Sequence, residues 1–120
     1  MTLKAQIYTR ALALTGELSM QKARLLELLC GTSSIALESM LRDGVTPNDC
    51  MSDFLIAAAM MAVAALIDAT GDTPQEQIEV GDFSVQKSAV SHDAASAVLM
   101  KQAELIMAPY LKDRFAFLGV

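Results

Sequence analysis

The stretch "FLIAAAMMAVAALI", residues 54–67, decides the fold of this chain, because all fourteen of its side chains are apolar. It lies inside a segment that we expect to be helical from about Pro47 to Ala69. The preceding "TPND" is a start signal, since Thr46 can cap the helix, Pro47 suits its first position and Asp49 can reach back to the cap. A helix that is apolar almost all round must be covered on most sides. It is therefore either the central helix of the monomer or a helix partly buried by a neighbouring subunit.

The same stretch raises the question of a membrane. At 14 residues it is shorter than the roughly 20 residues that cross a bilayer, and its many alanines suit a helix buried in protein. The N-terminus lacks the layout of a cleavable signal, because Lys4, Gln6 and Arg10 interrupt its apolar part. We expect a protein that is made soluble in the cytosol.

Three further segments carry apolar residues at steps of three and four, the period of a helix with one buried face. They cover about residues 2–14, 19–42 and 91–110. Gly31 falls inside the second segment, which either runs through or breaks there, and Gly44 can take the left-handed position after its last turn. Pro109 predicts an irregular last turn in the final segment. The buried residues expected on these segments are Leu3, Ile7, Ala11, Leu14, Leu26, Leu29, Cys30, Leu37, Met40, Leu41, Ala95, Val98, Leu99, Ala103, Ile106 and Met107.

The one stretch without a helical pattern is "QIEVGDFSVQK", residues 77–87. Gly81-Asp82 suits a two-residue turn, which pairs Val80 with Phe83 and Ile78 with Val85 on one face. A hairpin of two strands is marginal in water, so it must lean on the helices or join strands of another chain. The sequence therefore predicts a single mainly α domain over residues 1–120: a small bundle of about four helices with one short β-hairpin inserted before the last helix.

Charge and cysteine content limit the functions open to the chain. Nine basic and fourteen acidic residues give a net charge of −5 without any basic cluster, which argues against nonspecific nucleic-acid binding. Cys30 and Cys50 are the two cysteines, and each has apolar neighbours. We interpret them as buried free thiols of a reducing compartment, with a disulfide or a reactive thiol as the alternatives.

Chemical motifs are missing from the sequence. His92 is the single histidine, which leaves no His/Cys set for zinc. The acidic stretch 72–82 lacks the oxygen spacing of a calcium loop, and the glycines occur singly at boundaries rather than in a phosphate-binding loop. The eight methionines could line an adaptable groove, although core filling is the simpler interpretation. We expect no enzyme, no cofactor and no metal site.

The order of elements resembles a known family. A helical layer, a long apolar helix, a hairpin reading "IEVGDFSV", a further helix and the tail "APYLKDRFAFLGV" are similar to the small head–tail connector proteins (adaptors, or head-completion proteins) of tailed bacteriophages and prophages. The resemblance covers about residues 20–120. The first segment with "GELSMQKAR" has no match in it, and "GTSS" within the second segment is unusual.

The resemblance implies a structural virion protein of the head–tail neck, assembled in the cytoplasm of the bacterial host. Its partners are then copies of itself in a ring taken as dodecameric, the portal protein, and a tail-side connector or tail terminator. DNA would pass through the channel without sequence-specific binding, and an acidic wall would repel it. The partner-binding residues carried over are those of the hairpin and those of a docking tail over residues 114–120. They are Ile78, Val80, Gly81, Asp82, Phe83, Val85, Phe115, Phe117, Leu118 and Val120.

Two alternatives from other classes stay open. One is a small cytosolic protein-binding module of a bacterium, a regulator or chaperone that dimerises through its apolar helix. The other is an enzyme subunit whose active site forms only between chains, although the sequence offers no acid–base pair for it.

Overall fold

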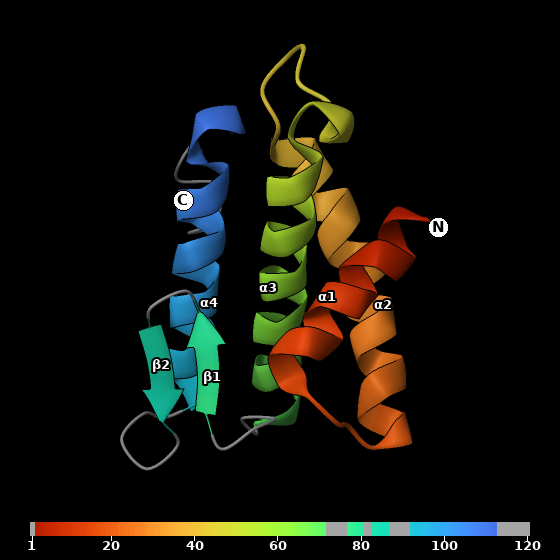
Figure 1. Cartoon of the computed structure of the whole chain (residues 1–120), viewed down its shortest axis with the longest axis vertical. Coiled ribbons are helices and arrows are strands. Elements are labelled where there is room, and N and C mark those ends of the chain that lie inside the picture. Colours follow the sequence, from red (N-terminus) through yellow and green to blue (C-terminus); the bar gives the residue numbers. More distant parts are fainter. Residues whose placement is uncertain (1, 72–76, 81–82, 87–91, 113–120) are drawn as a thin grey trace.

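The computed structural model describes residues 2–71, 77–80, 83–86 and 92–112, with the backbone alone for both strands and for residues 92–94. The described part is mainly helical, as the sequence predicts (Figure 1). Its elements are α1 (Leu3–Thr15), α2 (Met20–Met40), the 3-10 turn η1 (Pro47–Cys50), α3 (Met51–Thr70), strands β1 (Gln77–Val80) and β2 (Phe83–Gln86), α4 (His92–Met107) and the 3-10 turn η2 (Ala108–Tyr110).

Helix α3 is the centre of the bundle. It contacts α1, α2 and α4, which stand on different sides of it in Figure 1. Phe54, Val63, Leu66 and Ile67 are fully buried, and removing each such large side chain from water contributes about 1.5–3 kcal/mol. The alanines between them leave room for the neighbouring helices to approach. Of the two possibilities that the sequence left open, the structure supports the first: the chain's own helices cover α3.

The helical segment Pro47–Thr70, 24 residues long, is by length and composition able to cross a membrane. Its length therefore corrects the expectation drawn from the 14-residue apolar run, which is only part of it. The core helix of a soluble protein passes the same test, and 72% of the most apolar window of this segment is buried inside the fold. Burial, rather than length, is what identifies it as a core helix.

The start signal of this segment works through its acidic residue. The Asp49 carboxylate accepts hydrogen bonds from the backbone N–H of Thr46 at 2.8 Å and from the Thr46 hydroxyl at 3.0 Å. Pro47 occupies the first position, as predicted, and the first turn is 3-10 before α3 continues from Met51. The carboxylate thus satisfies a backbone donor that no helix hydrogen bond could reach.

Helix α2 is continuous through Gly31, which answers the question that the sequence left open. Its end differs from the prediction. The helix stops at Met40, and Leu41 is extended because it forms an antiparallel bridge with Leu111. Gly44 does have a left-handed φ of 86°, but in the turn that follows rather than as the cap of the helix.

The bridge joins two segments that are far apart in the sequence. The Arg42 N–H donates to the Tyr110 carbonyl at 2.9 Å, and the Lys112 N–H donates to the Met40 carbonyl at 3.0 Å. The chain leaving α4 through the predicted irregular turn at Pro109 is thereby fixed to the end of α2. Leu41 and Leu111 are each 7% exposed, so the bridge closes this end of the core.

Strands β1 and β2, which follow α3 and precede α4 in the sequence, pair antiparallel. Ile78 lies opposite Val85, and Val80 lies opposite Phe83. Strand β1 contacts α1 and α4 (Figure 1). The turn expected at Gly81-Asp82 and the side chains of both strands lie outside the described part. The apolar face assigned to this insertion, and its use, therefore stay predictions.

Candidate interaction site

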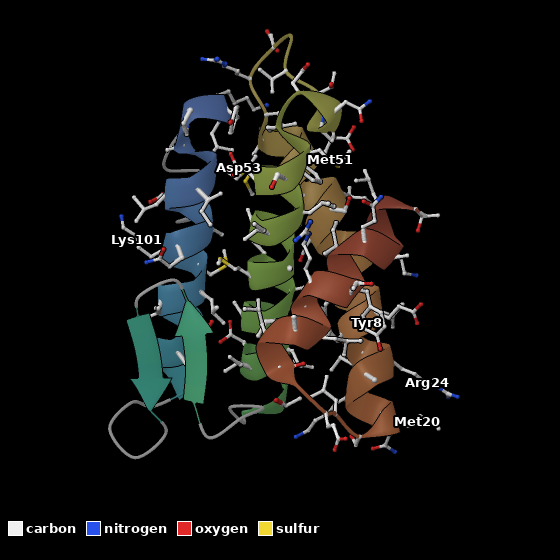
Figure 2. All side chains as sticks on the ribbon, viewed as in Figure 1. Tyr8, Met20, Arg24, Met51, Asp53 and Lys101 are labelled. Carbon is white, nitrogen blue, oxygen red and sulfur yellow. The ribbon has the colours of Figure 1, made fainter. Side chains whose placement is uncertain are left out.

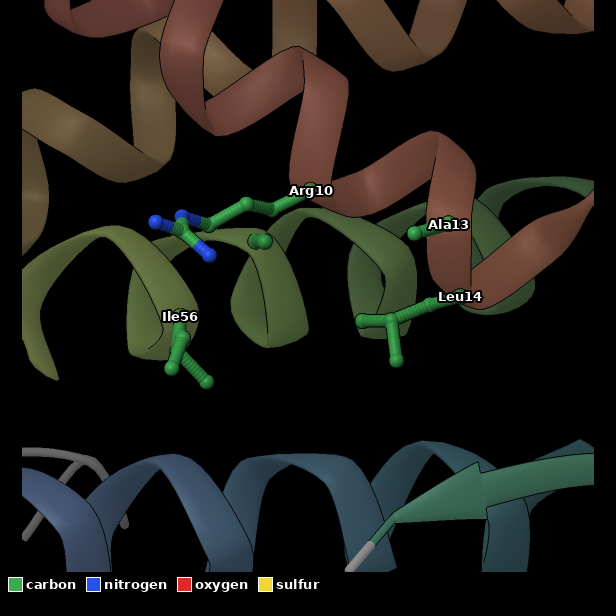
Figure 3. A pocket seen from close by; sticks show the side chains of 5 residues that line it. Arg10, Ala13, Leu14 and Ile56 are labelled. Carbon is green, nitrogen blue, oxygen red and sulfur yellow. The ribbon is translucent and has the colours of Figure 1, made fainter. Parts of the chain in front are cut away.

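A shallow hollow lies between α1 and α3 (Figure 3). It has a volume of about 170 Å³, and a neighbouring hollow of about 270 Å³ shares Arg10 with it. Arg10, Ala13, Leu14, Ile56 and Ala59 line the first, and Gln6, Thr9, Arg10 and Leu55 line the second. Arg10 thus lies between two separate shallow hollows.

Helical spacing builds the hollow. Arg10, Ala13 and Leu14 stand three and four positions apart on α1 and so share one face. Ile56 and Ala59 are three apart on α3 and supply the opposite wall. In Figure 3 the Arg10 side chain extends across α3, while Leu14 and Ile56 point to the same side. The result is an apolar floor beside one guanidinium group.

The lining of the hollow favours a protein partner over a substrate. It contains one cation and no carboxylate, thiol or imidazole, so it has no acid–base pair and no nucleophile. Pockets for drug-sized molecules measure roughly 300–1,000 Å³, whereas this hollow accommodates about one or two side chains. Arginine beside apolar residues is typical of the energetically dominant points of protein interfaces.

Buried polar groups elsewhere in the described part have structural explanations. Glu104, 4% exposed, pairs with Lys101 at 3.2 Å, and Figure 2 shows Lys101 at the outer side of α4. The Ser96 hydroxyl donates to the Ala64 carbonyl at 3.4 Å and so joins α4 to α3. Within residues 2–71 and 95–112 no buried side-chain polar atom lacks a partner, and no cluster of possible metal ligands occurs among the described residues.

Both cysteines are free and buried, which confirms the structural half of their interpretation. Burial first, and then the negative charge of Glu27, raise the pKa of Cys30 to about 11, while Lys4 opposes the shift. Burial likewise raises the pKa of Cys50. Since the thiolate is the reactive form, neither cysteine is suited to act as a nucleophile.

The residues that the resemblance assigned to partner binding are placed only in part. Ile78, Val80, Phe83 and Val85 belong to the paired strands. Gly81 and Asp82, and the tail residues Phe115, Phe117, Leu118 and Val120, lie outside the described residues. The structure therefore neither brings the two groups together nor separates them.

The hollow itself was missed at the level of sequence. Leu14 was assigned to the buried face of its helix, but it is only partly buried because it borders the hollow. The sequence pattern does not distinguish Ile56, which is partly buried, from the core residues around it in the apolar stretch. A signal was present in Arg10, which stands four residues before Leu14 and so interrupts the apolar face of α1.

Comparison of the chain with protein-family models, with curated proteins and with solved structures finds no match in any of the three. The resemblance in the order of elements therefore stays a prediction.

Proposed function

We propose that this chain is a structural subunit of the ring that joins the portal to the tail of a tailed bacteriophage and extends the channel for DNA. The single observation that carries the proposal is the hollow beside Arg10, because its size and lining suit side chains of a partner protein rather than a substrate. The resemblance in the order of elements supplies the identity of the partners. The net charge of −5 supports a channel component that DNA passes without binding.

In this proposal the parts outside the bundle make the assembly contacts. The strand pair forms a hairpin whose tip at Gly81-Asp82 reaches the adjacent subunit, and the segment Phe115–Val120 docks on the portal or on a tail-side protein. The hollow between α1 and α3 receives side chains of one of these neighbours. In a ring of this kind each interface buries two different patches, so each subunit contributes one patch to one neighbour and the other patch to the second neighbour.

The regulator alternative receives less support. It needs a dimer through the apolar helix, yet α3 is enclosed by α1, α2 and α4 of the same chain. The enzyme alternative needs a chemical group to contribute at a subunit boundary, and the hollow offers only one arginine.

The proposal predicts a portal gene near the gene of this chain, and the test is binding to the portal protein that such a gene encodes. Arg10→Glu reverses the charge in the hollow without touching the core, so it should weaken co-sedimentation with the portal or ring formation on it at least tenfold. Arg42→Glu is the matched control, because Arg42 is also exposed but lines neither hollow. Unchanged assembly of the Arg10→Glu variant would remove the hollow from the proposal, and absence of any binding by the wild-type chain would refute the proposal itself.

A further inference from the structure

The outer face of α2 carries three exposed apolar side chains, and the side chain of Lys4 lies beside Gly31 at the middle of this face. Four large hydrophobic residues are exposed in the described part of the chain, and three of them belong to α2: Met20 at 71%, Leu28 at 65% and Ile35 at 74%. The core residues Leu26 and Leu37 lie on the opposite side of the same helix. In Figure 2 Met20 points away from the bundle, as does Arg24 on the following turn.

The line is continuous along the helix. Met20, Arg24, Leu28, Gly31, Ile35 and Glu38 follow one another at steps of four, four, three, four and three residues, which keeps them on one face. This α2 face thus consists of three apolar side chains, a central glycine and one charge of each sign.

The fold of the monomer does not require a glycine at position 31. A glycine inside a helix costs about 1 kcal/mol relative to alanine. The φ of Gly31 is not positive, and an added Cβ atom would meet the Cδ atom of Lys4 at 3.5 Å, an ordinary contact. Alanine would therefore fit, and the missing side chain is explained if the backbone of another helix approaches at this point.

The two charged residues of the α2 face indicate which helix would approach Gly31. Arg24 and Glu38 each stand seven residues from Gly31, on opposite sides, and neither pairs with another charge in the described part of the chain. If a second α2 crosses antiparallel at Gly31, Arg24 faces Glu38 of the other copy, and Leu28 lies next to its Ile35. A parallel crossing would instead place like charges together.

We propose that the α2 face binds the α2 face of a second copy of this chain, antiparallel, about a two-fold axis at Gly31. One helix face buries far less than the roughly 800 Å² per partner of a standard interface, so the free protein should dimerise weakly, with a Kd on the order of 100 µM. This inference does not rest on the proposed function. Neighbours in a ring cannot share a two-fold contact, so this dimer is a form of the unassembled protein.

Sedimentation velocity of the purified chain alone tests the contact. Ile35→Asp should abolish the dimer, whereas Leu105→Asp, which changes an exposed apolar residue of α4 outside this face, should change the Kd less than threefold. Arg24→Glu and Glu38→Arg should each weaken the dimer about tenfold, and combining both changes in one chain should restore it. A wild-type chain that is monomeric at 1 mM, or a dimer insensitive to Ile35→Asp, would overturn the proposal.

Disulfide trapping tests the register. Gly31→Cys lies at the axis, where two α-carbons can come within the roughly 7 Å that a disulfide spans, so mild oxidation should link two chains. Met20→Cys is the control, because its counterpart would lie about 33 Å away at 1.5 Å per residue. Equal linking of both variants, or linking of Met20→Cys alone, would contradict the antiparallel crossing. Neither experiment contains a portal, so its failure would leave the proposed function untouched.

Discussion

The phenol of Tyr110 donates a hydrogen bond to Oδ2 of Asp53 at 3.1 Å, across 57 positions of the chain. It ties the turn after α4 to the first turn of α3, beside the bridge between Leu41 and Leu111. Two contacts between residues that are far apart in the sequence therefore meet at the same end of the bundle. This end is the point from which residues 113–120 continue, so its rigidity determines where the proposed docking tail starts.

Removing that hydroxyl should loosen this end without unfolding the protein. Tyr110→Phe is expected to lower Tm by a few degrees, because it deletes one hydrogen bond to a charged acceptor and leaves the ring in place. The hydrogen bond to Asp53, and then its negative charge, raise the pKa of Tyr110. The stabilisation is therefore complete below about pH 10, the pKa of an unperturbed tyrosine, and declines at higher pH.

Thermal unfolding followed by circular dichroism between pH 7 and 11 measures this effect. The wild type should keep its advantage over Tyr110→Phe up to about pH 10 and begin to lose it only above that pH, and Tyr8→Phe, on the side of α1, serves as the control. A difference in Tm that is constant with pH would contradict the assignment.

The thiols should be unreactive until the protein unfolds. Because the folded state raises the pKa of Cys30 to about 11, this thiol stays protonated at pH 8, and its contribution to stability is lost only as the pH rises from about 9 through 11. Labelling with a disulfide reagent at pH 8 should be at least a hundredfold slower in the native protein than in denaturant. Labelling of one or both thiols within seconds in the native state would show that they are not core residues.

A charge in the middle of α3 should unfold the domain. Ala64 is 1% exposed, and its carbonyl accepts the hydrogen bond from Ser96, so Ala64→Asp places an unpaired carboxylate where α3 meets α4. Such a change costs several kcal/mol, a large share of the stability of a small domain. Ala69→Asp on the exposed side of the same helix is the control and should stay folded. A cooperative transition for Ala64→Asp within 5 °C of the wild type would contradict the central position of α3.

The start of the α3 segment should respond to acid through Asp49. The Thr46 backbone N–H first, and then its hydroxyl, lower the pKa of Asp49. A lowered pKa in the folded state gives stability that is present above the unfolded pKa near 3.8 and is lost as the pH falls through the folded value. Asp49→Ala should lower Tm at pH 7 by a few degrees and by less at pH 3, whereas Asn48→Ala should change little. An equal decrease at both pH values would show that the carboxylate charge is irrelevant.

The helices could be predicted because local signals and burial agree. The apolar run of α3, the cap at Thr46 and the stop at Gly16 each act within a few residues, and the structure places the predicted core residues Ile7, Leu26 and Leu99 at zero exposure. The end of α2 could not be predicted, because it depends on pairing with Leu111, 70 positions away.

The candidate surfaces were harder to predict for the same reason. The hollow beside Arg10 is lined by residues of two different helices, and periodicity within one helix does not report how two helices combine. The α2 face was visible in principle, since Leu28 and Ile35 stand seven residues apart on the side away from the core. The buried face of α2 has more apolar residues, and it therefore dominates the apolar pattern of the segment.

Deleting Phe115–Val120 tests whether this segment docks on a neighbouring protein or belongs to the core of the bundle. If the tail docks on a neighbour, the truncated chain should keep its Tm within about 2 °C and lose ring formation on the portal. A loss of cooperative unfolding would instead assign the segment to the core and remove it from the proposed docking site.

Electron microscopy of the purified chain mixed with the portal protein that the proposal expects to be encoded near its gene tests the central claim most directly. The proposal predicts portal particles that carry an added ring of this protein at one end, with the rotational symmetry of the portal. Bare portals beside free monomers or dimers, with this chain in large excess over the portal, would contradict it.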